Sequence, residues 1–456
     1  MARLTIMTIV LSSLVGLSAS IAERLEPVPI PATKQRVGDA QKGYTYLVTG
    51  DYVRGGLPPF IFNLSPKEPV YLDREGRNKK LPHSFTAVTA PNGEPLVAPN
   101  CLQCHAQVFE DKLYIGLGNS AIDFSSSAPR PATTAIGMLE GVLKTTAPKQ
   151  YEASHPFLEV TRTISPGLVA EVRGVNLAMR LTALLVAHRD PFTLRWQKEA
   201  TMPVPDGAIP SDTPPWWLLK KKNAMFYNGF GRGDFGRFLM ASNLLTTSDS
   251  SEAAAVDRHM PDLLAYLYSI EPPKYPKEID AHLAGEGKLV FEKKCSSCHG
   301  KYGDKEEYPN LLIPQPIIGT DSMLHKSNQA APQFVNWFNN SWFTQGDHPA
   351  RLEPFDGYIA PPLDGIWITA PYLHNGSVPT LEALLNSKLR PRYWSRNFDK
   401  PEYDYERIGW KHAVHDAPQK KAYNTDIAGY GNYGHNFGDR LTDVERKAVL
   451  EYLKTL

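Results

Sequence analysis

Two copies of one short motif, C-x-x-C-H, constrain this chain more than any other feature of its sequence. Each copy places two thiols within one turn of chain and an imidazole directly behind them, which is the arrangement that attaches a c-type haem. In such a site the thiols bond covalently to the porphyrin, and the histidine becomes the proximal ligand of the iron. The sequence therefore predicts two covalently bound c-type haems. The copies use all four cysteines of the 456 residues, with Cys101, Cys104 and His105 in the first and Cys295, Cys298 and His299 in the second.

Two other uses of paired cysteines fit the chain less well. A structural zinc ion needs four clustered ligands. A disulfide framework is typical of a much smaller secreted chain.

The first 22 residues have the pattern of a secretory signal peptide. Arg3 gives a positive start, residues 4–17 form an apolar run, and residues 20–22 (Ser-Ile-Ala) resemble a cleavage site. The run is short for a membrane span, so we expect no stable membrane anchor, with a retained anchor as the alternative. Because c-type haem is attached outside the bacterial inner membrane, we expect a periplasmic or secreted protein.

The charge balance gives no indication of a nucleic-acid or anionic-membrane partner. The chain has 49 basic and 48 acidic residues, and loss of Arg3 with the signal peptide leaves 48 of each. With 39 prolines and 33 glycines, much of the chain must be irregular.

An internal repeat indicates two domains. Residues 263–270 and 449–456 align without gaps and share a Leu-x-Tyr-Leu core, and each follows its own haem motif. The proline-rich segment 271–277 is incompatible with a helix and separates the copies. We therefore expect a mainly α fold of two cytochrome c-like domains, with long irregular segments and a few short strands. The expected division is a signal peptide over 1–22, an N-terminal domain over 23–277 and a C-terminal domain over 278–456.

The two haem motifs are expected in different local settings. Residues 285–294 read as a helix that leads directly into the second motif, with Leu289 and Phe291 near the haem. The first motif lacks such a helix, and strand-like pieces such as residues 43–48 precede it. Thr442 and Glu445 form a capping box that predicts a final helix, in which apolar residues recur every four positions.

The ligand on the far side of each iron decides whether a haem only moves electrons or also reacts. For the second haem the favoured ligand is His435, which lies in the Gly- and Asn-rich stretch 431–438, where the backbone can approach a planar cofactor closely. His374 is the rival, although a contact to a propionate or to another ligand is preferred for it. Met323 lies too near His299 in sequence and is expected in the core.

No methionine or histidine stands out as the second ligand of the first haem. The unusual segment there contains Trp216 and Trp217, followed by Phe226, and these aromatics would form an apolar distal pocket. Packing in the core is the alternative for all three.

Residues 360–381, APPLDGIWITAPYLHNGSVPTL, resemble a stretch of the bacterial dihaem cytochrome c peroxidase superfamily. The sequence of this stretch is most similar to that of the dihaem rubber oxygenase branch. At the position of Ile368, the peroxidases have a methionine that binds the iron, and a maturation enzyme of the superfamily has a tyrosine. Isoleucine cannot bind iron, so the resemblance to the peroxidases and to the maturation enzyme is weakened. The oxygenase branch implies a histidine pair on the second haem, with the distal histidine at His435, and oxygen binding by the haem of His105. The peroxidase relatives also imply a possible calcium ion between the domains.

The sequence thus favours an exported dihaem oxidoreductase, an oxygenase or a peroxidase. The first haem would react with dioxygen or peroxide, and the second would store or relay electrons from a redox partner protein or a small donor. A pure electron-transfer cytochrome with both irons fully ligated is the alternative, and a haem-based sensor is a third.

Overall fold

The computed structural model describes residues 26–63, 68–125, 133–204, 207 and 209–456. The expected signal peptide over residues 1–22 lies outside these ranges. Within the described ranges, we find no helix with the length and apolar character that a membrane crossing requires.

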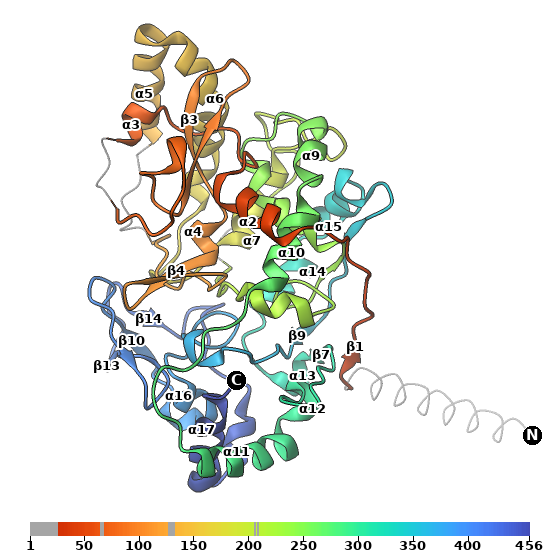
Figure 1. Ribbon diagram of the computed structural model, residues 1–456, viewed down its shortest axis with the longest axis vertical. Coiled ribbons are helices and arrows are strands. Elements are labelled where there is room, and N and C mark those ends of the chain that lie inside the picture. The colour runs from red at the N-terminus through yellow and green to blue at the C-terminus, as the bar shows by residue number, and fades with distance from the viewer. Residues whose placement is uncertain (1–25, 64–67, 126–132, 205–206, 208) are drawn as a thin grey trace, which may run out of the picture.

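Helices dominate the two ends of the molecule (Figure 1). Those before the proline-rich segment are α2 (Ala40–Thr49), α3 (Pro59–Phe62), α4 (Leu102–His105), α5 (Thr133–Thr146), α6 (Pro148–Ile164), α7 (Ala178–Ala187), α8 (Phe235–Leu239), α9 (Ser250–Asp257) and α10 (Met260–Ser269). Those after it are α11 (Ala281–Lys294), α12 (Ser296–His299), α13 (Gln315–Ile318), α14 (Met323–Ala330), α15 (Pro332–Asn339), α16 (Leu381–Leu385) and α17 (Asp443–Leu453). In the described part of the chain, eight short 3-10 helices lie among them, including η3 (Trp216–Lys221), η6 (Ile366–Ile368) and η8 (Asn436–Arg440).

The strands are short, and within the described residues they pair antiparallel in six small sheets. The sheets are β1–β7–β9, β13–β10–β14, β11–β12, β2–β3, β4–β5 and β6–β8. Their strands are β1 (Val28–Pro29), β2 (Phe85–Thr89), β3 (Pro95–Pro99), β4 (Ala106–Phe109), β5 (Lys112–Ile115), β6 (Gly231–Gly233), β7 (Leu311–Pro314), β8 (Ala350–Leu352), β9 (Gly357–Ile359), β10 (Tyr393–Ser395), β11 (Tyr403–Asp404), β12 (Gly409–Trp410), β13 (Ala413–His415) and β14 (Tyr423–Asn424).

The expectation of a mainly α fold is wrong. Helix accounts for 40% and strand for 14% of the structure, and irregular segments take much of the rest. Prolines and glycines are frequent in the connections between the helices, where the strands reach at most five residues and form small ladders instead of further helices.

Two helix pairs repeat one geometry in the two halves of the chain. Gly43 of α2 lies so close to α10 that an added Cβ would come within 1.9 Å of the Asp262 carbonyl oxygen and 2.9 Å of the Tyr266 Cβ. At Gly287 of α11 an added Cβ would come within 1.9 Å of the carbonyl oxygen of Ala448 in α17 and 2.9 Å of the Tyr452 Cβ. The two tyrosines are those that the sequence repeat aligns.

The expectation of a strand over residues 43–48 is therefore wrong, because this segment lies in α2. The Asp39 side chain accepts hydrogen bonds from the backbone of Gln41 and Lys42 and so caps the helix. Helix α2 occupies the place that α11 has in the other half, and the β2–β3 hairpin separates it from the first haem motif.

The final helix and its capping box are confirmed, because Thr442 accepts from the Glu445 backbone and Glu445 accepts from the Thr442 backbone. The expected apolar pattern is only partly right: Ala448 and Tyr452 are buried, whereas Val444 is 72% exposed. In α11, Phe291 is buried as expected but Leu289 is 69% exposed.

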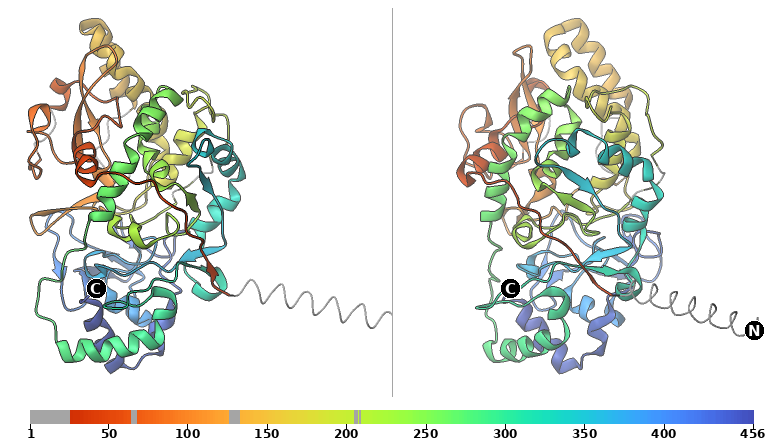
Figure 2. Two further views of the ribbon diagram at one scale, coloured as in Figure 1. Left: turned by 45° about the vertical axis from the view of Figure 1, so that its right-hand side comes forward. Right: turned by 90° about the vertical axis from the view of Figure 1, so that its right-hand side faces the viewer.

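Later parts of the chain return to the N-terminal half. Strand β8 pairs with β6, and β1 at the N-terminal end pairs with β7. The aromatic residues of α15 pack in the same apolar cluster as α2, α10 and Trp216. Figures 1 and 2 show α14 and α15 beside the N-terminal helices, with α11 and α17 forming the opposite end.

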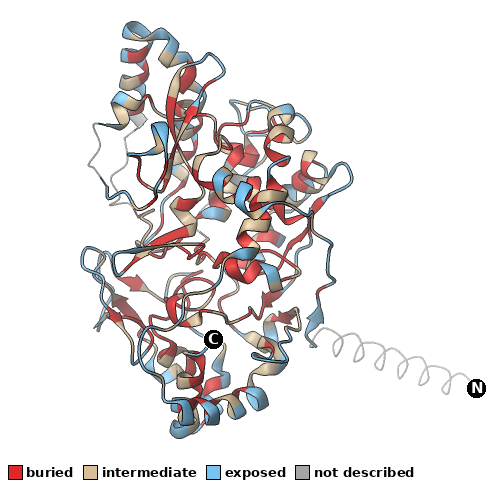
Figure 3. Cartoon of the chain, viewed as in Figure 1, coloured by how far each residue is buried: buried red, intermediate tan, exposed pale blue. Residues whose placement is uncertain are grey.

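Buried residues gather in separate apolar clusters that reach into both ends of the molecule (Figure 3). One apolar cluster contains α2, α10 and Trp216, and Cys101 packs against it. A second contains Phe291, Trp367 and Tyr452, and Cys295 packs against it. Each haem motif therefore lies at the edge of its own core.

Candidate functional site

The first C-x-x-C-H motif forms a single turn between two strands. Cys101 precedes α4, and its carbonyl accepts from the backbone N–H groups of Cys104, at 3.3 Å, and His105, at 3.1 Å. This turn brings both thiols and the imidazole to one side of the chain. The Tyr52 hydroxyl lies 3.3 Å from the Cys101 backbone nitrogen and ties the turn to the end of α2.

The second motif forms the same turn directly after α11. The Cys295 carbonyl accepts from Cys298 at 3.2 Å and from His299 at 3.0 Å. All four cysteines lie in described residues, and all four are partly buried. The two motifs are thus alike in backbone geometry.

The two proximal histidines differ in what holds their rings. Nδ1 of His299 lies 2.9 Å from the Pro361 carbonyl oxygen, so this nitrogen donates its proton to that carbonyl and Nε2 is left free to bind a metal. Nδ1 of His105 is buried and meets no hydrogen-bond partner among the described residues. Its ring instead stacks on Trp216, with the ring centres 4.4 Å apart and the planes at 16°.

His435 lies opposite His299. The two ring centres are 6.0 Å apart. A metal–imidazole bond is about 2 Å long and the ring centre lies about 1 Å behind the nitrogen, so two imidazoles on opposite sides of one iron have centres about 6 Å apart. Among the described residues, no second histidine ring makes such a contact with His105.

The backbone around His435 is held in an uncommon conformation. His435 has φ of 47° and ψ of 45°, in the left-handed region, and its N–H donates to the Ile318 carbonyl at 2.7 Å. Gly434 precedes it so close to Gly319 that a Cβ there would lie 2.2 Å from the Gly319 carbonyl carbon. Such strain persists only where the surroundings enforce it, and it is common at functional sites.

Arg390 enforces this loop conformation. Its guanidinium donates to the carbonyls of Asn432, at 2.8 Å, and Gly434, at 2.7 Å. It also reaches the carbonyls of Leu384 and His435. The arginine therefore fixes the loop to the end of α16.

Burial keeps the three predicted ligands uncharged. It lowers the pKa of His105 to about 3, and together with repulsion from Arg390 and from any protonated His299 it lowers that of His435 to about 3. Burial also lowers the pKa of His299, against the hydrogen bond to Pro361. Neutral imidazole is the form that binds a metal.

The residues therefore fit two c-type haems. Each motif sets two thiols and a neutral, buried imidazole on one turn, and His435 lies at the right separation from His299. For the thiols, burial raises the pKa of Cys104 to about 11 and that of Cys295 to about 11, so both are protonated before thioether bonds form.

The structure separates the three aromatic residues predicted for a distal pocket. Trp216 contacts the predicted proximal ligand His105, and Phe226 packs in the same cluster, against Phe230 and Phe238. Trp217 lies in the other cluster and donates its indole N–H to the Asp364 carbonyl at 2.8 Å. A distal role for these residues stays a prediction.

The rival ligands have other partners. His374 is buried and stacks on Tyr358, with ring centres 4.2 Å apart and its Nε2 3.1 Å from the Tyr358 hydroxyl. Met323 is 37% exposed, so the expectation that it lies in the core is wrong.

Sequence reasoning missed the groups that hold the ligands in place. Pro361 acts through a backbone carbonyl, which carries no signal in the residue type. Arg390 stands in no recognisable motif, and only the fold brings it to the loop around His435.

No site for a further metal ion can be assigned. Nowhere in the described ranges do three or more His, Cys, Asp or Glu side chains gather as a metal site. Calcium stays a prediction.

Comparison with known proteins supports a cytochrome c-like family. Residues 357–395 match a family model described as RoxA-like, cytochrome c-like. The match excludes both C-x-x-C-H motifs but includes Pro361 and Arg390, which hold the two histidines of the second site. It suggests a haem-binding oxidoreductase or electron-transfer role with covalently bound haem c.

Two curated relatives come from Sinorhizobium fredii. The uncharacterized protein y4iJ is 27% identical over 252 residues, which cover 41% of this chain and 41% of that protein. The uncharacterized protein y4iM is 26% identical over 224 residues, which cover 45% of this chain and 51% of that protein. The chain thus spans about half the length of these relatives or less.

Proposed function

We propose that this chain is an exported dihaem c-type oxidoreductase whose two haem sites have different roles. Cys101, Cys104 and His105 would hold the first haem. Cys295, Cys298 and His299 would hold the second, with His435 as its other axial ligand. When bound, c-type haem supplies one-electron iron chemistry, and an iron face without a protein ligand can also react with dioxygen or peroxide.

The observation that carries this proposal is the difference between the partners of the two proximal rings. His299 faces His435 with ring centres 6.0 Å apart. Among the described residues no histidine ring lies at that distance from His105, whose ring face packs on the indole of Trp216. A site with two protein ligands suits electron storage or relay, and a site with one suits reaction with a small oxidant.

The residues of the second site hold their positions firmly. Pro361 fixes the proton on Nδ1 of His299, which orients the ring and increases its basicity. Arg390 restrains the loop of His435 through several backbone carbonyls. Little rearrangement on a change of redox state favours rapid electron transfer.

Two neighbouring tryptophans connect the sites. Trp216 stacks on His105, and Trp217 donates to the carbonyl of Asp364, three residues beyond Pro361. This contiguous path supports transfer of electrons between the second site and the first.

The resemblance of residues 360–381 to dihaem oxygenases supports dioxygen or peroxide as the oxidant. Phe226, with φ of 68°, packs against Phe230 and Phe238, in the apolar cluster against which Cys101 also packs. An apolar wall of this kind would exclude water from the first site. The electron donor would be a redox partner protein or a small molecule.

Titration of the reduced protein with carbon monoxide tests the proposal, together with turnover assays using peroxide and dioxygen. We expect one carbon monoxide bound per two haems. A pure electron carrier, the alternative, would bind none and would show rapid reduction by a donor without turnover.

A further inference from the structure

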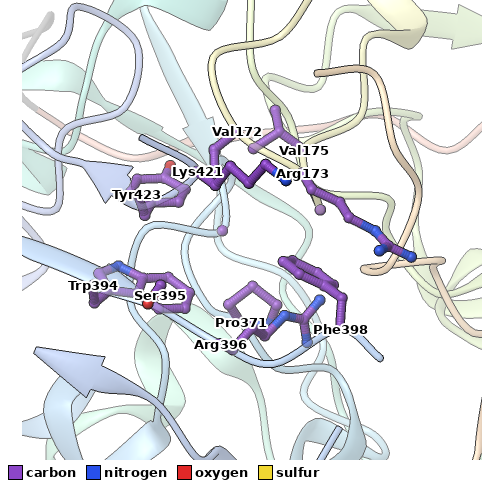
Figure 4. Close-up of a pocket in the computed structure, with 12 residues that line it drawn as sticks. Val172, Arg173, Val175, Pro371, Trp394, Ser395, Arg396, Phe398, Lys421 and Tyr423 are labelled. Carbon is purple, nitrogen blue, oxygen red and sulfur yellow. The ribbon is translucent and has the colours of Figure 1, made fainter. Parts of the chain in front are cut away.

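A narrow cavity opens where the loop before α7 meets the segments around β10 and β14 (Figure 4). Three of the 12 residues that line it are cationic, namely Arg173, Arg396 and Lys421, and none carries a carboxylate. Figure 4 shows Lys421 on one side of the gap and Arg396 with Phe398 on the other. The lining thus combines excess positive charge with apolar and aromatic walls.

The two guanidinium groups are fixed in place. Both lie against the Phe398 ring, with Cζ 4.7 Å from its centre for Arg173 and 4.5 Å for Arg396. Arg173 donates from Nε to the Ala121 carbonyl at 3.0 Å. Arg396 donates to the hydroxyl oxygen of Ser120 at 3.1 Å and also to its carbonyl. Neutral partners hold these side chains without balancing their charge.

No ion pair compensates these cations within the described part of the chain. Asp212 is the carboxylate that acts on Arg396, and its charge raises the pKa of the guanidinium. Burial and the charge of Arg173 act in the opposite direction and lower that pKa to about 9. Burial raises the pKa of Asp212 itself to about 7, so Asp212 is a weak counter-ion near neutral pH. The cavity therefore retains a net positive charge.

The backbone at the rim also indicates a functional constraint. Lys421 is exposed and has φ of 69°, a conformation that a residue with a long side chain seldom adopts. This conformation sets its side chain along the cavity.

The size of the cavity limits what it can hold. It encloses about 310 Å³ with its mouth included, so its interior suits a small group such as a carboxylate and not a bulky ring.

We propose that this cavity binds one carboxylate group, held by Arg173 and Arg396 with Lys421 at the rim. Guanidinium groups match the planar, two-oxygen geometry of a carboxylate. The carboxylate has two possible sources, a propionate of a bound haem or a free small molecule. The first source is plausible because Asn119, just before Ser120, donates to the Cys104 carbonyl at 2.9 Å, which places this loop beside the first haem motif.

The experiment uses the haem-loaded full chain and the variants Arg173→Gln and Arg396→Gln. Haem content is measured first from the pyridine haemochrome spectrum, so that failure of the dihaem proposal is seen separately in the unaltered protein. Sodium acetate is then titrated by calorimetry, and the midpoint potential of each haem is measured without acetate.

A free carboxylate as the ligand predicts that acetate binds the unaltered protein and binds each variant about tenfold more weakly, with unchanged potentials. A haem propionate as the ligand predicts no acetate binding and a lower potential for one haem in both variants, because positive charge near it is removed. The proposal is overturned if acetate does not bind and both potentials stay unchanged.

Matched variants separate charge at the cavity from charge elsewhere. Arg392→Gln removes an exposed arginine, just before β10, that pairs with Asp426 beyond β14, and it should change neither readout. Arg396→Lys should recover part of the effect. If Arg396→Gln does not fold, Lys421→Gln replaces it, because Lys421 is exposed. This variant should change acetate affinity or the haem potential in the same direction. No change in either quantity would overturn the proposal.

Discussion

The two halves of the molecule share a helix crossing and differ in how they hold a histidine. Gly43 and Tyr266 in one half correspond to Gly287 and Tyr452 in the other, and both glycines allow the same close backbone approach. The rings behind the two C-x-x-C-H turns have unlike partners, because His299 faces His435 whereas His105 lies against Trp216. The two halves thus share the helix crossing and differ in the surroundings of the two motif histidines.

The largest expected effect is loss of one haem site with retention of the other. Replacing both Cys295 and Cys298 by serine removes the thioether anchors of the second site only. We expect the covalent haem content to fall from two to one per chain, measured by mass spectrometry under denaturing conditions. Replacing Cys101 and Cys104 by serine should also leave one haem. The visible spectrum should then be that of the second site, whereas the first variant should show that of the first site. Two haems retained in either variant would contradict the assignment.

The next effect concerns the ligand opposite His299. Replacing His435 by alanine should convert the second haem from low-spin to high-spin, because the iron loses a strong axial ligand. Replacing His374 by alanine should not, because its ring contacts Tyr358. Electronic absorption spectra of the oxidised variants measure this, and the opposite pattern would move the ligand assignment to His374.

Sequence alone predicts two C-x-x-C-H turns, and both have the same backbone hydrogen bonds in the structure. Attachment of haem to them stays a prediction. The repeat also identifies Tyr266 and Tyr452, which do occupy equivalent crossings. The sequence does not reveal that α2 is the counterpart of α11, because a hairpin separates α2 from Cys101. Pro361 and Arg390 likewise stay hidden, since one acts through its backbone and the other through the fold.

The shared crossing makes a more moderate prediction about stability. Alanine at Gly43 or at Gly287 would place a Cβ 1.9 Å from a carbonyl oxygen, so the helices must separate. We expect either change to lower the free energy of unfolding by about 3 kcal/mol. Gly141→Ala is the control, because nothing lies within 4 Å of its added Cβ and alanine favours a helix. Urea unfolding measures the free energy of unfolding of all three variants. A loss of stability at only one of the two helix crossings would show that the crossings are not equivalent.

The smallest expected effect is a pH dependence carried by His374 in the second half. Burial, aided by the charge of His325, lowers its pKa to about 3, so the ring stays neutral in the folded chain. The unfolded chain takes up a proton below about pH 6.5, so the free energy of unfolding falls as the pH drops, by about 2 kcal/mol at pH 5.

The unaltered protein should therefore lose about 2 kcal/mol more stability between pH 7 and pH 5 than His374→Asn does. Urea unfolding at pH 7 and at pH 5 measures this difference. His282→Asn serves as the control, because the side chain of His282 is 87% exposed. An equal loss in the unaltered protein and in His374→Asn would show that this ring does not contribute.

Electron paramagnetic resonance of the oxidised, haem-loaded protein tests the central comparison most directly. We expect one high-spin and one low-spin iron in equal amounts. Two low-spin irons would contradict this expectation, because both haems would then be fully ligated.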